Sequence, residues 1–337
     1  MGRTCRDRRM QAIRSHILPS YGVHRPSPTW SRLVEQRQAA APSRSCAGAA
    51  KQQRRSGGVF RLDAATCTFQ CPGQPARLRL PDEALARFNE DGVVVIDNLV
   101  DAAAVQQLKQ RATQIAMAAA NAPGETIGPI TVQVEPAVLS GEVPNQGHFV
   151  DSVRKLAHIA FHDSIFEAHA RRPAILDVVE ALLDTPDLKL YQDQLFMKPA
   201  RVGSRQKVHQ DQPLGFHIEP TDRMVTAWLA LDPSATSTGA VRMMPGSHRR
   251  GVLTEEEKQA AEAASLMGQA EEWPIELAPG SVSFHHGHLL HSSTANESPV
   301  SRRGLATHYV SAHCRFTGNP DANDAMLVRG VSMPGHI

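Results

Sequence analysis

"KVHQDQPLGFHIEP" (Lys207–Pro220) contains two short motifs that each pair a histidine with a carboxylate. His209 and Asp211 form H-x-D, and His217 and Glu219 form H-x-E. In a strand, residues i and i+2 point to the same side, so His209 and Asp211 are placed to reach one metal together. The stretch therefore predicts a metal site carried by strands, and it leaves a third ligand to be found elsewhere in the chain.

The second half of the chain has the pattern of a β-sandwich or jelly roll. From Leu188 onward, short apolar segments alternate with Gly, Pro and Ser turns, as in antiparallel all-β architectures. The expected strands lie in "LKLYQDQLFMK", "MVTAWLALD", "GAVRMM", "IELA", "SVSFHH" and "GLATHYVSA". We therefore expect a mostly β fold with flanking helices.

Several helices are expected before these strands. "PDEALARFNEDG" (Pro81–Gly92) has Pro at its start and Gly at its end, which are the residues preferred there. A buried strand, "VVVIDNL", follows it. Asp101 is expected to cap a helix that runs to about Ala120. The segment Asp163–Asp184 predicts two further helices, broken at a proline.

The domain organisation follows from a change in composition. Residues 1–60 hold 12 of the 36 Lys and Arg residues but only 2 of the 34 acids. Residues 1–75 are therefore expected to form a disordered basic tail, a transit-like segment or, less favoured, a nucleic-acid-binding arm. Order should begin near Leu78, with residues 76–337 forming one domain. An insertion at residues 251–273 contains the acidic segment Thr254–Trp273, for which we expect a solvated surface helix or a lid.

Composition limits the partners of the folded part. With the basic tail set aside, the remaining chain is acidic, so no nucleic acid is expected to bind the folded domain. No run of apolar residues is long enough to predict a membrane span. Five scattered cysteines do not form a disulfide framework, which favours an intracellular, reducing compartment. That compartment is the cytoplasm, or an organelle if residues 1–60 act as a transit peptide. The sequence carries no signal for oligomeric state.

A third metal ligand is offered by a later histidine cluster. "SFHHGHLLHSSTANESPVSRRG" contains His285, His286, His288 and His291. Two histidines and one carboxylate on one face of an octahedron form the site of non-haem Fe(II) oxygenases. Spacing alone does not choose among the four histidines.

These motifs together resemble a known family. "VHQDQ", "TAWLALDPSATSTGAVRMMPGSH" and "LAPGSVSFHHGHLLHSSTANESPVSRRG" look like the phytanoyl-CoA dioxygenase family, whose members are Fe(II)- and 2-oxoglutarate-dependent oxygenases. The resemblance runs from about Phe88 to Ala312. It implies a double-stranded β-helix core, that is, a jelly-roll or cupin-like fold. The implied cofactors are Fe(II), 2-oxoglutarate as cosubstrate and dioxygen.

The resemblance also assigns roles to individual residues. The family's H-x-D motif matches His209 and Asp211, and its distal histidine is followed eleven residues later by an arginine, as His291 is by Arg302. It thereby implies His209, Asp211 and His291 as the catalytic metal ligands. The pair His217 and Glu219 has no counterpart in the family pattern.

The cosubstrate site is implied in the same way. Arg302 is expected to grip the distal carboxylate of 2-oxoglutarate through two charge-assisted hydrogen bonds, with Ser293 donating a third. Arg303 is the rival of Arg302, because adjacent strand residues face opposite sides. Four further residues are candidate cosubstrate contacts: Gln194, Trp228, Lys155 and Lys198.

The sequence thus predicts a dioxygenase that hydroxylates a small organic or acyl substrate. An aspartate at position 211 favours hydroxylation, because related halogenases leave this position to a small residue. Two alternatives stay open: a divalent-metal hydrolase or isomerase that uses the same ligands, and a catalytically silent binding protein of the same fold. No pattern in the chain identifies the substrate.

Overall fold

The computed structural model describes residues 58–69, 76–120, 126–143, 149–212, 217–319 and 323–337. The expected tail, apart from its last part, lies outside these residues. The sequence predicted regular structure from about Leu78 onward. The structure has a strand before that point, β1 (Phe60–Asp63), which pairs in parallel with β4 (Val93–Asp97). Arg61 on β1 also forms an ion pair of 2.6 Å with Asp97 on β4. The partner strand thus stabilises a segment whose own four residues carry little signal.

The helices expected from the sequence are present. The α-helices are α2 (Ala64–Cys67), α3 (Asp82–Asp91), α4 (Ala102–Ala120), α5 (Pro136–Leu139), α6 (Ser164–Ala170), α7 (Pro173–Leu183) and α8 (Glu255–Leu266). Short 3-10 helices are η1 (Phe149–Ser152), η2 (Thr236–Thr238) and η3 (Ser247–Arg250). Asp101 caps α4 as predicted, with its Oδ1 accepting from the backbone N–H of Ala104 at 2.8 Å.

Among the described residues, ten strands form the larger of two principal sheets. Its order is β1-β4-β14-β11-β16-β8-β7-β6-β5, with β18 also paired to β8. The remaining bounds are β5 (Thr126–Ile127), β6 (Ile130–Val134), β7 (Val153–Ala157), β8 (Leu188–Phe196), β11 (Met224–Ala230), β14 (Val282–His286), β16 (Gly304–Ser311) and β18 (Met326–Arg329). The three central strands, β14, β11 and β16, pair antiparallel.

The second sheet has four strands, in the order β13-β12-β15-β9. Their bounds are β9 (Gln206–His209), β12 (Val241–Met243), β13 (Trp273–Ile275) and β15 (His291–Ser293). Two small ribbons pair β2 (Thr68–Phe69) with β3 (Arg77–Leu78) and β10 (Ile218–Glu219) with β17 (Arg315–Phe316). Most of these short strands pair with segments distant in the sequence. The sequence pattern predicted β12 in full and the strand that carries His209, which is β9.

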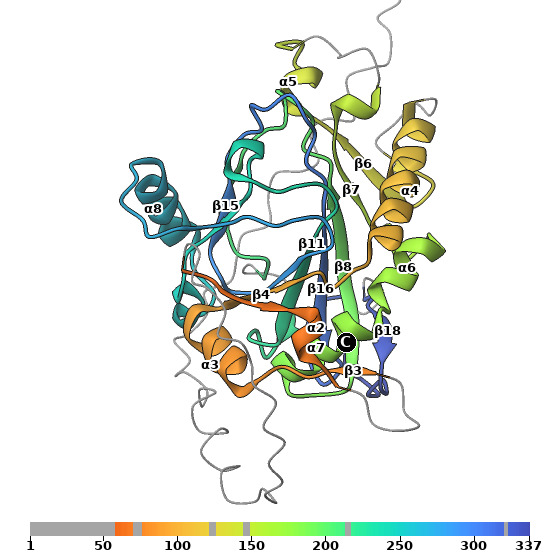
Figure 1. Ribbon diagram of the computed structural model, residues 1–337, viewed down its shortest axis with the longest axis vertical. Coiled ribbons are helices and arrows are strands. Elements are labelled where there is room, and N and C mark those ends of the chain that lie inside the picture. The colour runs from red at the N-terminus through yellow and green to blue at the C-terminus, as the bar shows by residue number, and fades with distance from the viewer. Residues whose placement is uncertain (1–57, 70–75, 121–125, 144–148, 213–216, 320–322) are drawn as a thin grey trace, which may run out of the picture. The chain divides into compact units, whose positions relative to one another are not determined.

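Alternation along the strands separates two cores. Val94 and Ile96 of β4 pack with the helices, whereas Val93 and Val95 face the second sheet. The same alternation on β11 places Val225, Ala227 and Leu229 in the helical core and Trp228 in the core between the sheets. Helices α3, α4, α6 and α7 thus cover one face of the large sheet, and α8 lies apart from them beside β9 (Figure 1).

Helix α3 ends where the sequence predicts. Gly92 adopts φ 82°, and its N–H donates to the carbonyl of Phe88 at 2.8 Å. A left-handed residue at this position favours glycine. A Cβ here would also lie 2.5 Å from Nδ1 of His248, so the close packing on this histidine reinforces the choice.

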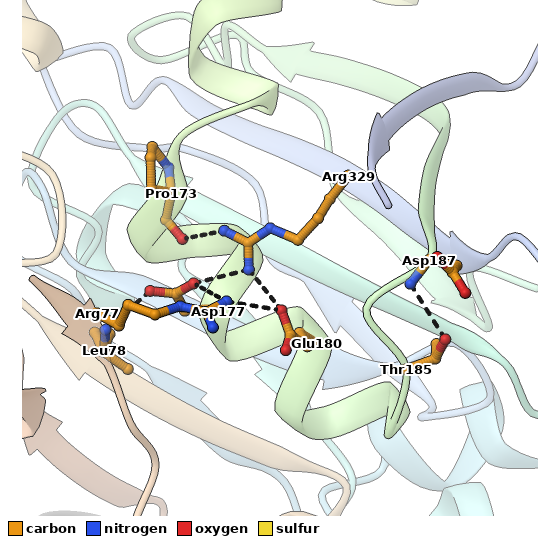
Figure 2. Close-up of polar contacts among 8 residues, drawn as sticks. All are labelled: Arg77, Leu78, Pro173, Asp177, Glu180, Thr185, Asp187 and Arg329. Carbon is orange, nitrogen blue, oxygen red and sulfur yellow. Dashed lines mark hydrogen bonds and ion pairs between the residues drawn. The ribbon is translucent and has the colours of Figure 1, made fainter. Parts of the chain in front are cut away.

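An ionic cluster anchors the last strand to α7 (Figure 2). Arg329 on β18 contacts Asp177 Oδ1 at 2.7 Å and Glu180 Oε2 at 2.8 Å. Asp177 also accepts from the backbone N–H of Leu78 at 2.9 Å, and Arg77 completes the cluster. The helix therefore ties β3 and β18 together behind the large sheet.

One expected strand needs correction. "IELA" (Ile275–Ala278) was expected as a strand, but β13 spans Trp273–Ile275. Pro274 lies in this strand because β13 is at the edge of its sheet, where a missing N–H is tolerated. The expected surface helix at Thr254–Trp273 is confirmed as α8, and Thr254 caps it in a capping box with Glu257.

Candidate active site

A cavity of about 420 Å³ lies between the two principal sheets. Its walls carry Thr226, Trp228 and His308 from the large sheet and His291 and Ser293 from the small one. All nine site residues expected from the sequence line it: His209, Asp211, His291, Arg302, Ser293, Gln194, Trp228, Lys155 and Lys198.

Three potential metal ligands converge at one end of this cavity. His209 ends β9 and is the register partner of His291, which begins β15. Asp211 lies in the bend after β9, not in a strand as expected. Its Oδ1 is 4.0 Å from Nε2 of His209 and 3.5 Å from Nε2 of His291. One ligand atom from each residue lies within 4.8 Å of the other two, close enough for one ion to bind all three.

Backbone carbonyls fix both histidines in the orientation that a metal needs. Nδ1 of His209 lies 2.8 Å from the carbonyl of Lys207, and Nδ1 of His291 lies 3.0 Å from that of Leu289. Because each carbonyl accepts a hydrogen bond from Nδ1–H, the lone pair of each neutral ring is at Nε2. Both lone pairs are therefore available at the point where the carboxylate converges.

The charge states also suit metal binding. Burial, followed by the neighbouring His291, lowers the pKa of His209 to about 3. Burial alone would raise the pKa of Asp211, but His291, His308 and His285 outweigh it and hold that pKa well below its usual range. At neutral pH the site therefore offers an ionised carboxylate and a neutral His209, the forms that bind metals. Burial lowers the pKa of His291, but Asp211 outweighs it and raises that pKa, so a metal must compete with a proton for this ring.

A row of three polar side chains supports the carboxylate from the large sheet. Thr226 on β11 is the register partner of His285 on β14 and of His308 on β16. Oδ2 of Asp211 accepts from Thr226 Oγ1 at 2.6 Å and from His285 Nε2 at 2.8 Å. These bonds occupy Oδ2 and leave Oδ1 facing the two histidines.

The sequence did not predict roles for Thr226 and His308. His285 agrees with the interpretation of this histidine as a residue of the sheet that supports a metal ligand. The sequence does contain a feature that points to these residues, because they are polar residues in otherwise apolar strands. This feature predicts a shared role only when the strand register is known, since the register places all three residues in one row.

Two buried basic side chains, Arg302 and Lys198, also line the cavity, and neither forms an ion pair with a carboxylate among the described residues. Arg302 is 2% exposed, and its Nη2 donates to the carbonyl of Gly239 at 2.7 Å. Its Nε is buried and has no hydrogen-bond partner among the described residues. Lys198 Nζ donates to Ser293 Oγ at 2.7 Å. Burial, and next the charge of Arg302, lowers the pKa of Lys198 to about 6.

Trp228 forms the wall behind this arginine. The guanidinium carbon of Arg302 lies 5.2 Å from the centroid of the Trp228 ring, a cation–π geometry. The indole occupies space that a side chain at position 304 would need, because a Cβ on Gly304 would overlap it. Glycine at the start of β16 thus permits the stacking.

Arg303, the other candidate for the cosubstrate anchor, does not point into the cavity. Arg303 forms a two-pronged ion pair with Asp232, at 2.6 Å from Nε and 3.1 Å from Nη2, and does not line the cavity. On the cavity wall, Lys155 Nζ donates to Gln194 Oε1 at 3.2 Å. Gln194 lies on β8, whereas Lys198, the last residue of the expected strand, lies beyond the end of β8 at Phe196.

The other motif residues lie away from the cavity lining. His217 packs its ring 6.2 Å from that of Phe316, and Glu219 belongs to the β10–β17 ribbon. His286 and His288 contact one another on the far side of β14, with ring centroids 5.0 Å apart. The H-x-E pair is therefore not brought into the site.

A family model described as phytanoyl-CoA dioxygenase matches residues 88–304. The chain belongs to the phytanoyl-CoA dioxygenase family. Members of this family are non-haem, Fe(II)- and 2-oxoglutarate-dependent oxygenases that use dioxygen. The family membership, the enzyme class and the cupin-like fold expected from the sequence are thus confirmed.

Individual relatives are distant. A probable phytanoyl-CoA dioxygenase of Caenorhabditis elegans is 25% identical over 68% of this chain and 75% of its own length. The 1-deoxypentalenic acid 11-beta-hydroxylase of Streptomyces arenae is 28% identical over 64% of this chain and 75% of its own length. The mouse phytanoyl-CoA dioxygenase domain-containing protein 1 is 26% identical, and the chain spans 63% of its length.

Solved structures share the fold. EctD from S. alaskensis with bound Fe has a TM-score of 0.58 at 21% identity, covering 76% of this chain and 88% of that one. The epimerase SnoN, in complex with Fe3+, alpha ketoglutarate and nogalamycin RO, has a TM-score of 0.53 at 18% identity, with 75% and 95% covered. Within the described part of this chain, no helix has the length and apolar character needed to span a bilayer.

Proposed function

We propose that this chain is an Fe(II)- and 2-oxoglutarate-dependent hydroxylase of a small organic or acyl substrate. The observation that carries the proposal is the pairing of two features in one cavity. Three metal donors line the cavity, and the same cavity holds the buried guanidinium of Arg302 and the amine of Lys198, neither of which has an ion-paired carboxylate among the described residues. An arrangement of this kind suits a cosubstrate that chelates a metal with one end and presents an anion with the other.

The metal would be held by His209, Asp211 and His291. Their fit rests on the two free Nε2 lone pairs and on the carboxylate oxygen that its own hydrogen bonds leave open. When bound, iron with 2-oxoglutarate and dioxygen supplies the oxidising power that converts a C–H bond to C–OH, with succinate and carbon dioxide as the other products. Asp211 fills the carboxylate position, which favours hydroxylation over halogenation.

The distal carboxylate of 2-oxoglutarate would be held by Arg302, Ser293 and Lys198. The guanidinium can donate two parallel hydrogen bonds to one carboxylate, and its Nε is at present without a partner. Lys198, which contacts Ser293, would take up a proton as the anion binds, because its pKa in the free protein is about 6. The distal carboxylate would offset the buried charge of Arg302, and the proton on Lys198 would add a second attraction.

The remaining expected residues would shape the cosubstrate site. Trp228 holds the guanidinium plane in place. Lys155 and Gln194 form a bonded pair on the wall, where they would contact the cosubstrate or the substrate beside it. The cavity would serve to keep water and other reactive groups away from the reacting centre.

We also propose an intracellular, reducing location, in the cytoplasm or an organelle. Cys67 and Cys314 are buried free thiols within the described residues, which is consistent with such a compartment. The expected organelle signal, residues 1–60, lies outside the described part of the chain except for its last three residues.

The test is succinate formation from 2-oxoglutarate by the full chain with Fe(II) and oxygen. Wild-type protein is expected to form succinate even without the true substrate, through slow uncoupled turnover. Asp211→Ala and Arg302→Ala should abolish or strongly reduce it, whereas Arg249→Ala, at an exposed site, should not. Equal turnover by wild type and Asp211→Ala would refute the ligand assignment.

A further inference from the structure

The polar row beside Asp211 fixes the direction of each hydrogen bond within it. As an ionised carboxylate, Asp211 can only accept. Thr226 has one hydroxyl hydrogen, and its 2.6 Å contact with Oδ2 of Asp211 uses that hydrogen. The second contact of this hydroxyl, 2.9 Å from Nδ1 of His308, must therefore have the ring nitrogen as donor. The hydrogen-bond chain assigns the proton of His308 to Nδ1.

The other nitrogen of this ring is left as an acceptor. A neutral imidazole that carries its proton on Nδ1 presents a lone pair at Nε2. His308 is buried and Lys155 lines the same cavity, so a second proton, which would place a positive charge on the ring, is disfavoured. The ring lines the cavity, and Nε2 has no hydrogen-bond partner among the described residues. It is also not one of the fully buried atoms that lack a partner, so it is accessible from the cavity.

His285 provides a contrast within the same row. It donates from Nε2 to Asp211 at 2.8 Å, and its Nδ1 is sealed inside the protein without a partner. His285 is therefore a support for the carboxylate and offers nothing to a ligand. His308 differs because its free nitrogen is on the open side.

The position of His308 places this acceptor close to the proposed metal. Its Nδ1 lies 3.6 Å from Oδ2 of Asp211. Nε2 is on the other side of the same imidazole ring, so it lies farther from Asp211 by about the width of that ring. The cavity lining also carries cations and amides, including Lys155, Arg154 and Gln192, and Gln192 is the register partner of His308. A neutral acceptor among cations selects a group that can donate a hydrogen bond.

We propose that Nε2 of His308 accepts a hydrogen bond from a hydroxyl or amine N–H group of the substrate, next to the carbon that is oxidised. The proposal rests on the proposed function and deepens it by naming the substrate class. A bare hydrocarbon segment at this point would leave the acceptor buried and unpaired, which disfavours it. The amide-rich wall formed by Gln133, Gln192, Gln194 and Gln206 supports the same polar class.

The first test reads the tautomer directly. The full chain, labelled with ¹⁵N-histidine and loaded with Zn(II), is examined by long-range ¹H–¹⁵N correlation, with His308→Gln used to assign the signals. The expected spectrum shows a protonated Nδ1 and an unprotonated Nε2 at His308. A proton on Nε2 would overturn the proposal.

The second test measures selectivity with matched probes. Small alcohols are each paired with their methyl ether, which lacks the hydrogen-bond donor, and stimulation of succinate formation is measured for both. Wild type is expected to favour the donor-bearing member by roughly 10- to 100-fold in kcat/KM. His308→Phe should remove this preference, and His308→Gln, which keeps an acceptor, should restore part of it.

Two controls distinguish a failure of the proposal for His308 from a failure of the proposed function. The exposed His313, which pairs with Asp187, gives the matched variant His313→Phe, and its preference should equal that of wild type. Calorimetric binding of 2-oxoglutarate to the Zn(II) protein reports on the proposed function alone. If 2-oxoglutarate binds but no probe pair shows a donor preference, the inference about His308 fails and the proposed function stands. If 2-oxoglutarate does not bind, the proposed function itself fails.

Discussion

Replacing Arg302 with methionine should weaken 2-oxoglutarate binding without destabilising the free protein. The guanidinium is 2% exposed, so water does not screen its attraction for a bound carboxylate. Truncating one partner of a buried, hydrogen-bonded charge pair costs about 2–5 kcal/mol of binding free energy. Lys198 remains 2.7 Å from Ser293 and retains part of the attraction. We therefore expect a loss of about 3 kcal/mol, which is about a 100-fold increase in Kd.

The free protein should respond in the opposite way. Before the ligand binds, Arg302 is a buried cation whose Nε has no partner among the described residues, and burying such a charge is costly. Its contact with Trp228 returns about 1–2 kcal/mol. The free energy of unfolding of Arg302→Met should therefore stay within about 1 kcal/mol of wild type or exceed it.

The assay is isothermal titration of 2-oxoglutarate into Zn(II)-loaded protein, together with thermal unfolding of the ligand-free form. Arg303→Met is the matched control, because it removes the bonds to Asp232 at 2.6 and 3.1 Å. This neighbour should lose stability by about 1–3 kcal/mol and keep its Kd. Wild-type affinity in Arg302→Met, or a large loss of affinity in Arg303→Met, would refute the assignment of the anchor.

Three further predictions follow from the same contacts. Lys198 has a pKa of about 6 in the free protein, against 10.5 for an ordinary lysine, so it must take up a proton to bind an anion. The Kd for 2-oxoglutarate should therefore rise as the pH increases above 6. Lys198→Met should make this Kd less dependent on pH. For the same reason the unfolded chain binds more protons between pH 6 and 10.5, so the contribution of Lys198 to the free energy of unfolding should rise with pH in that window, as denaturant titrations of wild type and Lys198→Met would show. Thr226→Val removes a hydrogen bond to Asp211 and should weaken metal affinity about 10-fold, measured by Zn(II) competition with a chelating dye; unchanged affinity would contradict the supporting role. Thr254→Ala removes the capping box of α8 and should lower the free energy of unfolding by about 1 kcal/mol. The affinity for 2-oxoglutarate should not change. A change in that affinity would instead favour a role of α8 as a lid.

Local signals in the sequence predicted the helices and most of the central strands. Pro81 and Gly92 delimit α3, and Asp101 caps α4, because caps depend on residues within one turn. The H-x-D pair was equally visible, since both residues lie in one short segment. The anchor at position 302 needed the family spacing, because both neighbouring arginines have the right chemistry.

Features that depend on distant pairing were not predictable. Strand β1 carries little pattern of its own and is stabilised by β4, more than thirty residues away. The support of Asp211 needs Thr226, His285 and His308 in one row, and a register error of one residue would turn each of them to the other face. Sequence alternation shows which residues share a face on one strand, but it does not show which residue on the next strand lies opposite.

The most direct measurement is an anaerobic titration of 2-oxoglutarate into the Fe(II)-loaded full chain, followed by visible absorption. A 2-oxo acid that chelates Fe(II) gives a charge-transfer band, so wild type is expected to develop a saturable band. Asp211→Ala should show none, and Arg302→Met should need about 100-fold more cosubstrate to reach the same amplitude. Saturable 2-oxoglutarate binding without this band, or an unchanged band in Asp211→Ala, would contradict the assignment of this cavity as the iron and cosubstrate site.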